Sequence, residues 1–484
     1  MSLQPLDPRT AEIFPMAARH LLGDTQLRKN VRHATDVIQN KRRIVVDEMP
    51  DWQELRESGK RLREHTMQHL REYLEQFERN CTAAGGVVHW ARDAAEARQI
   101  VVSLAKSAGA KEVIKIKSMT TEEIQLNPAL AAAGIRPYET DLAELIIQLG
   151  HDQPSHIVVP ALHKNRQQIR EIFRREMNLP DLGPSPQDLA DAARLFLREK
   201  FLTVPTAVSG ANFLIAETGG VCVVESEGNG RMCLTLPDTL ITIAGIDKVI
   251  PRYEDLGVLL QLLPRSATGE RMNPYNSIWT GVHPGDGPKA FHVILMDNAR
   301  TSILADAEGR QTLNCIRCGA CQNACPVYRQ TGGHAYGSVY AGPIGAILTP
   351  QLMQMEHAQS LPYASSLCGA CYEVCPVKIN IPEVLIHLRN KVVKEKSWAD
   401  PEAIALKTVA SIFRSERRFR AAQRLGRIAE RPLVRKDGQG DGWISWLPGL
   451  LGGWTQVRDL QSMPKESFRE WWEKRAETKG GSDV

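Results

Sequence analysis

The sequence predicts an α/β domain, followed by a small helical domain of the ferredoxin type and a helical tail. Short apolar runs alternate with helical stretches from Gly85 onward, which is the pattern of a parallel sheet covered by helices. Seven of the ten cysteines lie between Cys315 and Cys375, and the segment 407–436 carries ten basic residues against two acidic ones. At about 150 residues per domain, a chain of 484 residues has room for about three such units.

The first predicted element is a helical arm over residues 1–79. In its second half the apolar residues Leu62, Leu70, Leu74 and Phe77 recur at helical spacing. We therefore expect one face of the arm to pack on the domain that follows.

The α/β domain is predicted over residues 80–300. Strands are expected at 87–90, 113–116, 135–138 and 157–159, and helices at 94–108 and around 122–124. The later segments 212–225, 232–246 and 291–298 are rich in β-forming residues, with glycine turns at 219–220 and 228–230. This alternation predicts a mixed α/β domain built on a parallel sheet.

Composition and charge exclude several classes of protein. The net charge of +4 and the lack of a nucleic-acid-reading module argue against a nucleic-acid partner. The first residues lack the basic and apolar runs of a signal peptide, and no stretch approaches 18 uncharged apolar residues. We therefore expect a cytoplasmic protein, in which clustered cysteines bind metal rather than form disulfides.

Two cysteine motifs lie in a domain predicted over residues 301–395. The first is C-x2-C-x2-C-x3-C-P and the second is C-x2-C-x3-C-P. Thiolates at these gaps are typical of iron–sulfur clusters, whereas zinc takes four ligands in two pairs and fits seven cysteines poorly. In two-cluster ferredoxins the cysteine before the proline binds the other cluster. We therefore expect one cluster on Cys315, Cys318, Cys321 and Cys375, and a second on Cys325, Cys368 and Cys371.

The second motif lacks its first cysteine. Counting back by the spacing of the first motif, the missing ligand falls at Ser365, whose hydroxyl is a harder and more weakly acidic donor than a thiol. Three outcomes are open: a three-iron (3Fe-4S) cluster, a four-iron cluster with an open or serine-bound iron, or a ligand from elsewhere. The remaining thiols, Cys81, Cys222 and Cys233, are expected to be small buried apolar side chains.

About forty residues separate the two motifs, which favours a longer helical domain over a compact small ferredoxin. Within this insert, His334 and Tyr336 are candidates for hydrogen bonds to a cluster, with ordinary loop packing as the alternative.

Several motifs of the α/β domain resemble those of the lactate-utilisation (LUD) domain family. They are Glu217-Thr218-Gly219, the run from Glu225 to Arg231, and Lys117-Ser118-Met119. Joined to the cysteine motifs and a tryptophan-bearing tail, they make the chain similar to the LutB (LldF-type) iron–sulfur subunits of L-lactate oxidation complexes. The resemblance implies a NagB/RpiA/CoA-transferase-like fold, two four-iron (4Fe-4S) clusters, and partner subunits of the LutA and LutC types.

The resemblance also implies candidates for a ligand pocket, with no catalytic residue among them. They are Lys117, Ser118, Glu217, Glu227, Asn229 and Arg231. On the residues alone, the polar turns fit either a ligand pocket or two solvated hairpin turns. Neither a G-x-G-x-x-G fingerprint nor a Walker loop is present.

The function expected from these features is electron transfer in the oxidation of L-lactate to pyruvate, with electrons passed one at a time towards a quinone or another respiratory acceptor. No flavin motif is recognisable, so the chain is expected to be a non-flavin subunit of a lactate dehydrogenase complex. Two alternatives stay open. One is the same role with another 2-hydroxy acid, such as glycolate; the other is an acyl- or CoA-handling enzyme with structural clusters and Glu225 or Glu227 as nucleophile.

The last region, residues 396–484, is predicted to be a basic, tryptophan-rich helical tail. Arginines at helical spacing indicate an amphipathic helix for a membrane surface on its inner face or for an acidic partner, with a solvated helix as the alternative. These arginines are Arg414, Arg417, Arg418, Arg424, Arg427 and Arg431. The five tryptophans between Trp443 and Trp472 suit either a protein interface or the core of this region.

Overall fold

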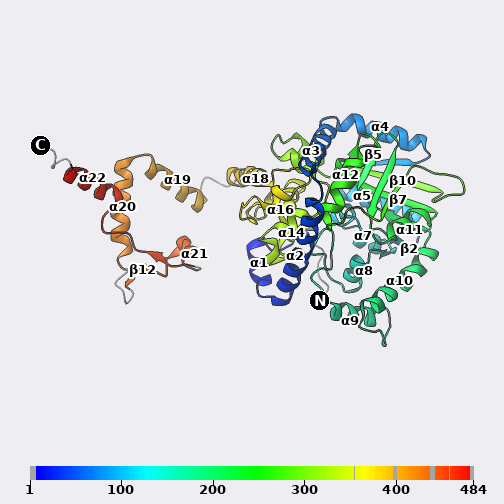
Figure 1. Cartoon of the computed structure of the whole chain (residues 1–484), viewed down its shortest axis with the longest axis horizontal. Helices are drawn as coiled ribbons and strands as arrows, with labels where there is room; N and C mark the ends of the chain where they lie inside the picture. Colours follow the sequence, from blue (N-terminus) through cyan, green and yellow to red (C-terminus); the bar gives the residue numbers. More distant parts are fainter. Residues whose placement is uncertain (1–6, 354, 396–399, 437–441, 457, 480–484) are drawn as a thin grey trace. The chain divides into compact units, whose positions relative to one another are not determined.

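The computed structural model describes residues 7–353, 355–395, 400–436, 442–456 and 458–479. They fall into two compact units, Met1–Val392 and Val393–Val484. The first unit contains the N-terminal helices, the α/β domain and both cysteine motifs (Figure 1). Within the described ranges, no helix combines the length and the apolar character needed to cross a membrane.

The centre of the first unit is a six-stranded sheet whose neighbouring strands all run parallel, which confirms the predicted fold class. The strand order is β1-β10-β7-β4-β2-β3. The strands are β1 (Val87–Ala91), β2 (Glu112–Lys115), β3 (Arg136–Glu139), β4 (Thr206–Ser209), β7 (Thr239–Gly245) and β10 (Ala290–Met296). The central strand β7 is apolar on both faces because helices and a second sheet cover it.

The second sheet has four strands in the order β8-β5-β6-β9. Its strands are β5 (Phe213–Ile215), β6 (Gly220–Glu225), β8 (Val249–Ile250) and β9 (Tyr275–Trp279). Strands β5 and β6 form an antiparallel hairpin that turns at Gly219. This glycine has a φ of +67°, and a Cβ there would lie 2.2 Å from the backbone nitrogen of Cys81, so a larger residue does not fit.

Helices cover the six-stranded sheet on one face, and on the other the sheet shares a core with the second sheet and the cysteine region. The covering helices include α5 (Ala94–Ser107), α6 (Met119–Glu123) and α7 (Leu126–Ala132). A separate small core joins α8 (Leu142–Leu149), α9 (Arg166–Glu176) and α10 (Pro186–Thr203). Helices α11 (Asn229–Thr235) and α12 (Leu256–Ala267) complete the α/β domain.

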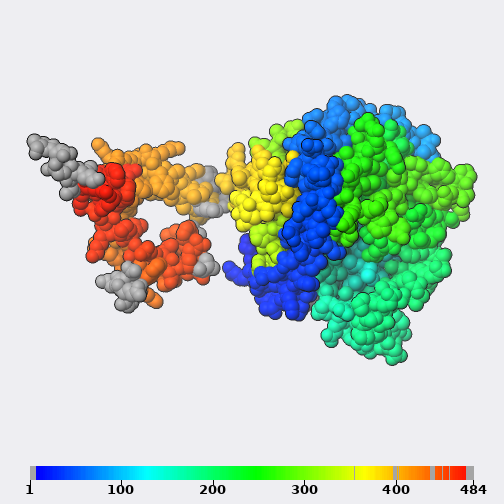
Figure 2. Space-filling model, in the orientation of Figure 1, coloured from blue at the N-terminus to red at the C-terminus, as the bar shows by residue number. Residues whose placement is uncertain are grey.

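The N-terminal helices join the α/β domain to the cysteine region. They are α1 (Phe14–Leu21), α2 (Thr25–Asp47), α3 (Trp52–Gln68) and α4 (Leu70–Ala83). Helices α2 and α3 contact α12 on one side, and α2 contacts the cysteine helices on the other. In Figure 2 they form the blue ridge between the yellow cysteine region and the green α/β domain. The arm predicted to pack on one domain therefore packs on two.

The cysteine region is built from short helices. They are α13 (Arg300–Ala305), η2 (Gly309–Asn314), α14 (Ala320–Ala324), α15 (Tyr328–Thr331), η3 (His334–Tyr336), α16 (Gly342–Leu352), η4 (Met355–His357), η5 (Leu361–Tyr363), α17 (Ala370–Val374) and α18 (Ile381–Glu395). The apolar residues Leu385 and Leu388 of α18 are buried in the main core.

The second unit contains helices and a small antiparallel sheet. Its elements are α19 (Pro401–Phe413), α20 (Glu416–Glu430), β11 (Arg435–Lys436), β12 (Gly442–Ile444), η6 (Gly449–Leu451), α21 (Gly452–Thr455), β13 (Leu460–Gln461) and α22 (Phe468–Lys479). Most of the predicted basic residues lie on α20, where Arg427 pairs with Glu470 at 3.1 Å. Trp446 and Trp472 are more than half exposed, so these side chains lie at the surface rather than in a core.

One expected strand is absent from the structure, and one segment expected to be strand-rich is helical in its first part. The apolar run 157–159 is a loop, because the ring nitrogen Nδ1 of His156 accepts hydrogen bonds from the amides of Val158 and Val159, each at 3.0 Å, in place of a strand partner. The segment 232–246 begins with the end of helix α11 and enters strand β7 only at Thr239.

Candidate iron–sulfur centres and the adjoining cavity

The four cysteines assigned to the first cluster line one small cavity, here termed the inner cysteine site. Cys315, Cys318 and Cys321 come from the first motif, and Cys375 comes from the second. The rest of the wall is largely apolar, with Ile316, Ile344, Val377, Ile379 and Ile381. The fold therefore brings together thiols from two motifs that are about fifty residues apart.

Backbone amides point at the sulfurs of this site. The amide of Arg317 donates to Cys315 Sγ at 3.3 Å, and the amide of Ile379 donates to Cys375 Sγ at 3.3 Å. Arg317 and Gly319 have φ values of +61° and +75°, which fold the loop tightly around the cavity. Donors of this kind stabilise negative charge on sulfur.

The chemistry of the inner cysteine site fits an iron–sulfur cluster. Burial raises the pKa of Cys375 to about 11, and burial, followed by the charges of neighbouring thiolates, also raises the pKa of Cys318 and that of Cys321. Without a cation these thiols stay protonated at neutral pH, and four soft donors around one buried space are the ligand set that iron in a cubane requires.

The cysteines assigned to the second cluster also lie close together, and we term them the outer cysteine site. The thiol of Cys371 interacts electrostatically with those of Cys325 and Cys368. Cys325 and Cys371 are buried, whereas Cys368 is exposed. A backbone hydrogen bond from Ala370, followed by the Ser366 hydroxyl, lowers the pKa of Cys368. The outer cysteine site therefore reaches the protein surface.

The two cysteine loops share one backbone conformation. Leu367 (φ +55°) and Gly369 (φ +83°) stand where the first loop has Arg317 (φ +61°) and Gly319 (φ +75°). Helices α14 and α17 begin at the same offset and have equal length.

Ser365 takes the place of Cys315 in this repeat. The amide of Leu367 donates to Ser365 Oγ at 3.1 Å, as the amide of Arg317 does to Cys315 Sγ. The hydroxyl oxygen of Ser365 therefore occupies the position that the first loop gives to a ligand atom.

Two arginines of the N-terminal helices, the buried Arg56 and the partly buried Arg42, hold the second motif in place. Arg56 Nε donates to the carbonyl oxygen of Cys375 at 2.9 Å, and its Nη2 donates to that of Tyr372 at 3.0 Å. Arg42 donates to the carbonyl oxygen of Val374 at 3.1 Å. These guanidinium groups also place positive charge beside Cys375, which favours an anionic cluster.

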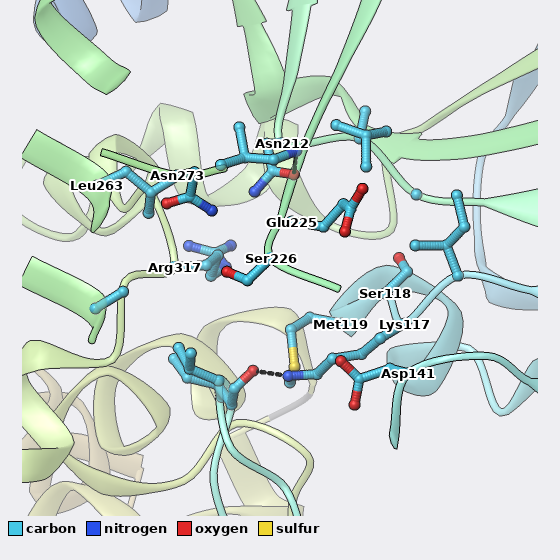
Figure 3. A pocket seen from close by; sticks show the side chains of 18 of the residues that line it. Lys117, Ser118, Met119, Asp141, Asn212, Glu225, Ser226, Leu263, Asn273 and Arg317 are labelled. Atoms are coloured by element: carbon cyan, nitrogen blue, oxygen red, sulfur yellow. Dashed lines mark hydrogen bonds between the residues drawn. The ribbon is translucent and has the colours of Figure 1, made fainter. Parts of the chain in front are cut away.

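A larger cavity of about 370 Å³, here termed the central cavity, lies at the carboxyl ends of the parallel strands. Residues that follow β2, β3, β4, β7 and β10 line it, as expected for ligand sites in open α/β sheets. Its polar and charged lining residues are Lys117, Ser118, Thr120, Asp141, Asn212, Glu225, Ser226, Glu227, Asn229, Lys248, Thr268, Asn273, Arg300, Arg317 and Tyr340. Figure 3 shows Lys117 and Arg317 on opposite sides of this space.

Arg317 belongs both to the central cavity and to the inner cysteine site. Its amide bonds to Cys315, while its guanidinium donates to Asp247 Oδ2 at 3.3 Å and lies over the ring of Tyr340. Arg300 donates to Asp247 Oδ1 at 2.6 Å, so both oxygens of this buried carboxylate are engaged. One residue thus separates the cavity from a ligand of the inner cysteine site.

Three carboxylates lie on the side of the cavity formed by β6 and β3. Glu225 accepts hydrogen bonds from the amides of Glu227 and Gly228, and so holds the turn before α11. Partial burial, followed by the nearby charges of Asp141 and Glu225, raises the pKa of Glu227 to about 7. Glu227 therefore titrates near neutral pH.

The structure brings only some of the predicted pocket residues together. Lys117, Ser118, Glu227 and Asn229 line the central cavity. Glu217 instead accepts from the amide of Tyr253 in a different depression, and the Arg231 side chain is exposed away from the lining.

Several lining residues were missed from the sequence. Lys248 and Asp141 come two and three residues after predicted strand segments, so their position after a strand was the available signal. Asn212 follows β4, a strand that was not predicted, so it had no such signal. Arg317 stands between Cys315 and Cys318. Its place in the sequence was therefore the available signal that a residue of the cavity adjoins the cysteines.

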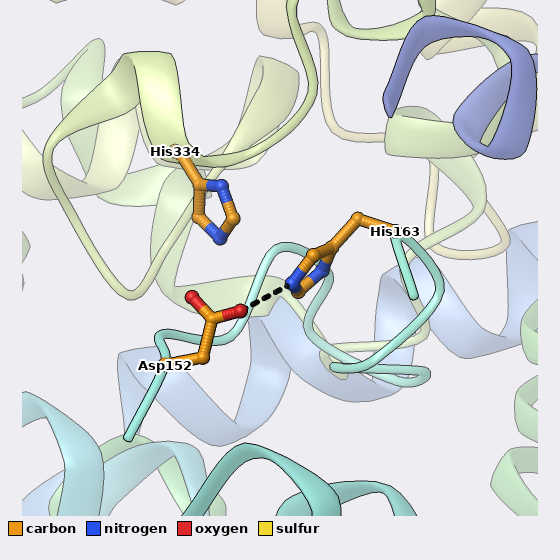
Figure 4. A group of neighbouring side chains, drawn as sticks. All are labelled: Asp152, His163 and His334. Carbon is orange, nitrogen blue, oxygen red and sulfur yellow. Dashed lines mark hydrogen bonds and ion pairs between the residues drawn. The ribbon is translucent and has the colours of Figure 1, made fainter. Parts of the chain in front are cut away.

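A group formed by Asp152, His163 and His334 has spacing that suits a metal ion, but its atoms are already engaged (Figure 4). His163 bonds to Asp152 at 3.1 Å and to Ser155 at 2.7 Å, and Lys164 pairs with the same carboxylate. His334 bonds to the carbonyl oxygen of Gln153 at 2.9 Å, so it joins the insert to the α/β domain.

The three other cysteines are buried in the core of the α/β domain. Burial raises the pKa of Cys81 to about 11 and that of Cys222 and Cys233 to about 12. Each is fully buried; Cys81 and Cys222 pack in the apolar core, and the thiol of Cys233 also lies 3.6 Å from Thr140 Oγ1.

Comparison with known families gives three matches in the order of the predicted regions. Residues 74–296 match the LUD domain, residues 311–379 match a 4Fe-4S dicluster domain, and residues 388–477 match the C-terminal region of lactate utilisation protein B.

Curated relatives match nearly the whole chain. Lactate utilization protein B 1 of Bacillus mycoides (strain KBAB4) is 42% identical over 454 residues, which cover 94% of each protein. Lactate utilization protein B of Oceanobacillus iheyensis is 43% identical over 93% of this chain and 94% of the relative, and that of Shouchella clausii is 42% identical over 94% and 95%. A solved structure, a DUF162 family protein from Deinococcus radiodurans, is 14% identical and aligns with a TM-score of 0.27 over 47% of this chain and 98% of that one.

Proposed function

The chain belongs to the lactate utilization protein B family, and we propose that it is an iron–sulfur electron-transfer protein in the oxidation of L-lactate. The names of its relatives and the dicluster domain support this role. The observation that carries the proposal is the inner cysteine site, in which thiols from both motifs line one cavity.

Two clusters bound at these sites would supply one-electron steps, because each cubane passes a single electron. The fold places three sites in order: the central cavity, the inner cysteine site and the outer cysteine site. The central cavity adjoins the inner cysteine site through Arg317, and the outer cysteine site reaches the surface at Cys368. Electrons from a two-electron donor would therefore leave the chain singly at the exposed end, towards a quinone or another carrier.

Growth on defined carbon sources tests this function. A strain that lacks the gene is complemented with the wild type, with Cys375→Ala, or with the control Cys222→Ala, whose thiol lies in the α/β core. We expect growth on L-lactate with the wild type and the control only, and growth on glycolate with all three. If the Cys375→Ala strain instead loses growth on glycolate and keeps growth on L-lactate, the chain serves the oxidation of another 2-hydroxy acid.

We further propose that both clusters have four irons and that Ser365 supplies the fourth ligand of the second. In the second loop its hydroxyl oxygen stands at the position equivalent to Cys315 Sγ in the first loop. It accepts the equivalent hydrogen bond from the backbone amide two residues later. Ser365→Cys should keep about eight irons per chain, and Ser365→Ala should give an oxidised three-iron EPR signal. If Ser365→Ala retains all its irons and both reduction potentials, the ligand lies elsewhere.

For partners, we propose subunits of the LutA and LutC types, held in part by the second unit. Its exposed aromatic side chains, among them Trp471 and Trp472, suit a protein interface. Alanine at both positions should reduce co-purification of these subunits. Retention equal to that of the wild type would place the interface on the first unit.

The acyl-transfer alternative depends on a nucleophilic glutamate. Glu225 is occupied by the amides of its own turn, so Glu227 is the remaining candidate. Replacement of Glu227 by Gln should leave lactate-dependent growth in place if the chain is an electron-transfer protein, and abolish it if Glu227 attacks a substrate.

A further inference from the structure

Lys248 is the one lysine or arginine of the central cavity that has no hydrogen-bond or ion-pair partner among the described residues. Its neighbour Asp247 is not available, because its two carboxylate oxygens accept from Arg300 at 2.6 Å and from Arg317 at 3.3 Å. Lys117 donates to the carbonyl oxygen of Ile157. The cavity therefore contains one half-buried ammonium group that makes no hydrogen bond or ion pair within the described chain.

Leaving that charge unpaired costs free energy. Burial, followed by the charge of Arg317, lowers the pKa of Lys248, whereas the Asp247 carboxylate and the Cys315 thiolate raise it. An anion bound beside the Lys248 ammonium group would replace the interactions with water that burial removes. It would also offset the electrostatic repulsion from the neighbouring Arg317 guanidinium.

Neutral hydrogen-bonding groups face the same space. The side-chain oxygen of Asn212 accepts a hydrogen bond from the amide of Val224 at 2.9 Å, so the NH2 group of Asn212 points away from Val224. Asn212, Asn273 and Arg317 extend toward a common region in Figure 3. Leu263 lies beside them and supplies an apolar wall, so the cavity combines apolar surface with a few polar groups, as small-molecule sites do.

The charges around the cavity favour a single negative charge on the ligand. Arg300 and Arg317 are already balanced by buried carboxylates, and the lining also contains the carboxylates of Asp141, Glu225 and Glu227. A doubly charged phosphate would meet this repulsion, whereas a carboxylate needs only the one unpaired ammonium.

We propose that the central cavity binds the carboxylate group of a small organic acid, with Lys248 as its charge partner and Asn212 as a hydrogen-bond donor. The volume of about 370 Å³ is at the lower end for small-molecule sites and admits an acid of a few carbons with water. This deepens the proposed function, since it places a 2-hydroxy or 2-oxo acid beside the loop of the inner cysteine site.

Calorimetric titration of the anaerobic, cluster-loaded full-length protein tests the site. The probes are L-lactate, pyruvate, inorganic phosphate and lactamide, the last being the neutral analogue of lactate. We expect at least one carboxylate to bind and lactamide to fail. Lys248→Gln should weaken binding at least tenfold, Lys248→Arg should retain it within a few fold, and the control Lys289→Gln should leave it unchanged, because Lys289 pairs with Asp238 at the surface.

A second variant keeps the test decisive if Lys248→Gln does not fold. Asn212→Asp preserves the acceptor for Val224 and adds a negative charge to the cavity, so it should weaken carboxylate binding at least tenfold. The inference is overturned if neither carboxylate binds, if only phosphate binds, or if binding persists in the variants that fold.

The outcome is separable from that of the proposed function. Absence of binding together with lactate-dependent growth through Cys375 would remove the cavity assignment alone. Carboxylate binding without a growth requirement on L-lactate would remove the lactate function and keep the site.

Discussion

The hydroxyl group of Tyr336 shows how a single side chain can be matched to a bound cluster. It is buried, it has no hydrogen-bond partner among the described residues, and its strongest electrostatic neighbour after burial is Cys325. Burial of an unpaired hydroxyl is unfavourable. A cluster on the outer cysteine site would give it a sulfur acceptor.

We expect Tyr336→Phe to lower the reduction potential of the outer cluster by about 20–60 mV, because one hydrogen bond of about 0.5–1.5 kcal/mol to the reduced state is lost. Tyr328→Phe is the control, since its hydroxyl donates to the carbonyl oxygen of Ser155 at 2.7 Å. EPR-monitored redox titration measures both. Equal shifts in the two variants would show that Tyr336 has no special contact.

Glu227 gives a pH dependence at the same scale. Its pKa is raised to about 7, above the ordinary 4.5, so the folded state binds the proton more tightly than the unfolded state. Stability contributed by this proton is therefore lost as the pH rises from about 4.5 through 7. We expect Glu227→Gln to raise the thermal midpoint at pH 8 by about 2 °C and to change it little at pH 4.5. A midpoint raised equally at both pH values would contradict this assignment.

At the scale of elements, helix α3 stabilises the second cysteine motif through Arg56. Arg56→Ala would leave the carbonyl oxygens of Cys375 and Tyr372 without their donor, at a cost of about 2–4 kcal/mol. We expect a lower thermal midpoint and a lower iron content of the inner cluster. Arg61→Ala is the control, because Arg61 is exposed on the same helix. Similar losses in both variants would mean that α3 is merely destabilised.

Much of the element pattern could be predicted from the sequence, because periodicity reflects local burial. The parallel sheet was predicted correctly from alternating strands and helices. The loop at 157–159 was not, since its amides are satisfied by His156, and Ile157 N is held by Gln322 of helix α14 at 3.3 Å. Such a contact between distant segments leaves no periodic trace in the sequence.

The candidate sites divide in the same way. The grouping of cysteines follows from their spacing and the proline rule, and Ser365 follows from counting along the same repeat. The central cavity does not, because Asn212, Lys248 and Arg317 come from separate segments that meet only at the carboxyl ends of the strands. The motif resemblance found Lys117 and Glu227 there.

For the whole molecule, the first unit contains the central cavity, the inner cysteine site next to it, and the outer cysteine site at the surface. The N-terminal helices contact both the α/β domain and the cysteine region, which fixes the cavity next to Cys315. In the proposed function this order lets a reaction in the interior be coupled to a carrier at the surface. The central claim is therefore that two clusters exist and that each takes one cysteine from the opposite motif.

Iron and sulfide analysis combined with EPR of the anaerobically purified full-length protein tests that claim most directly. We expect about eight irons and eight sulfides per chain. We further expect Cys375→Ala to remove only the inner cluster signal and Cys325→Ala only the outer. About four irons per wild-type chain, or loss of the inner signal in Cys325→Ala with the outer retained, would contradict it.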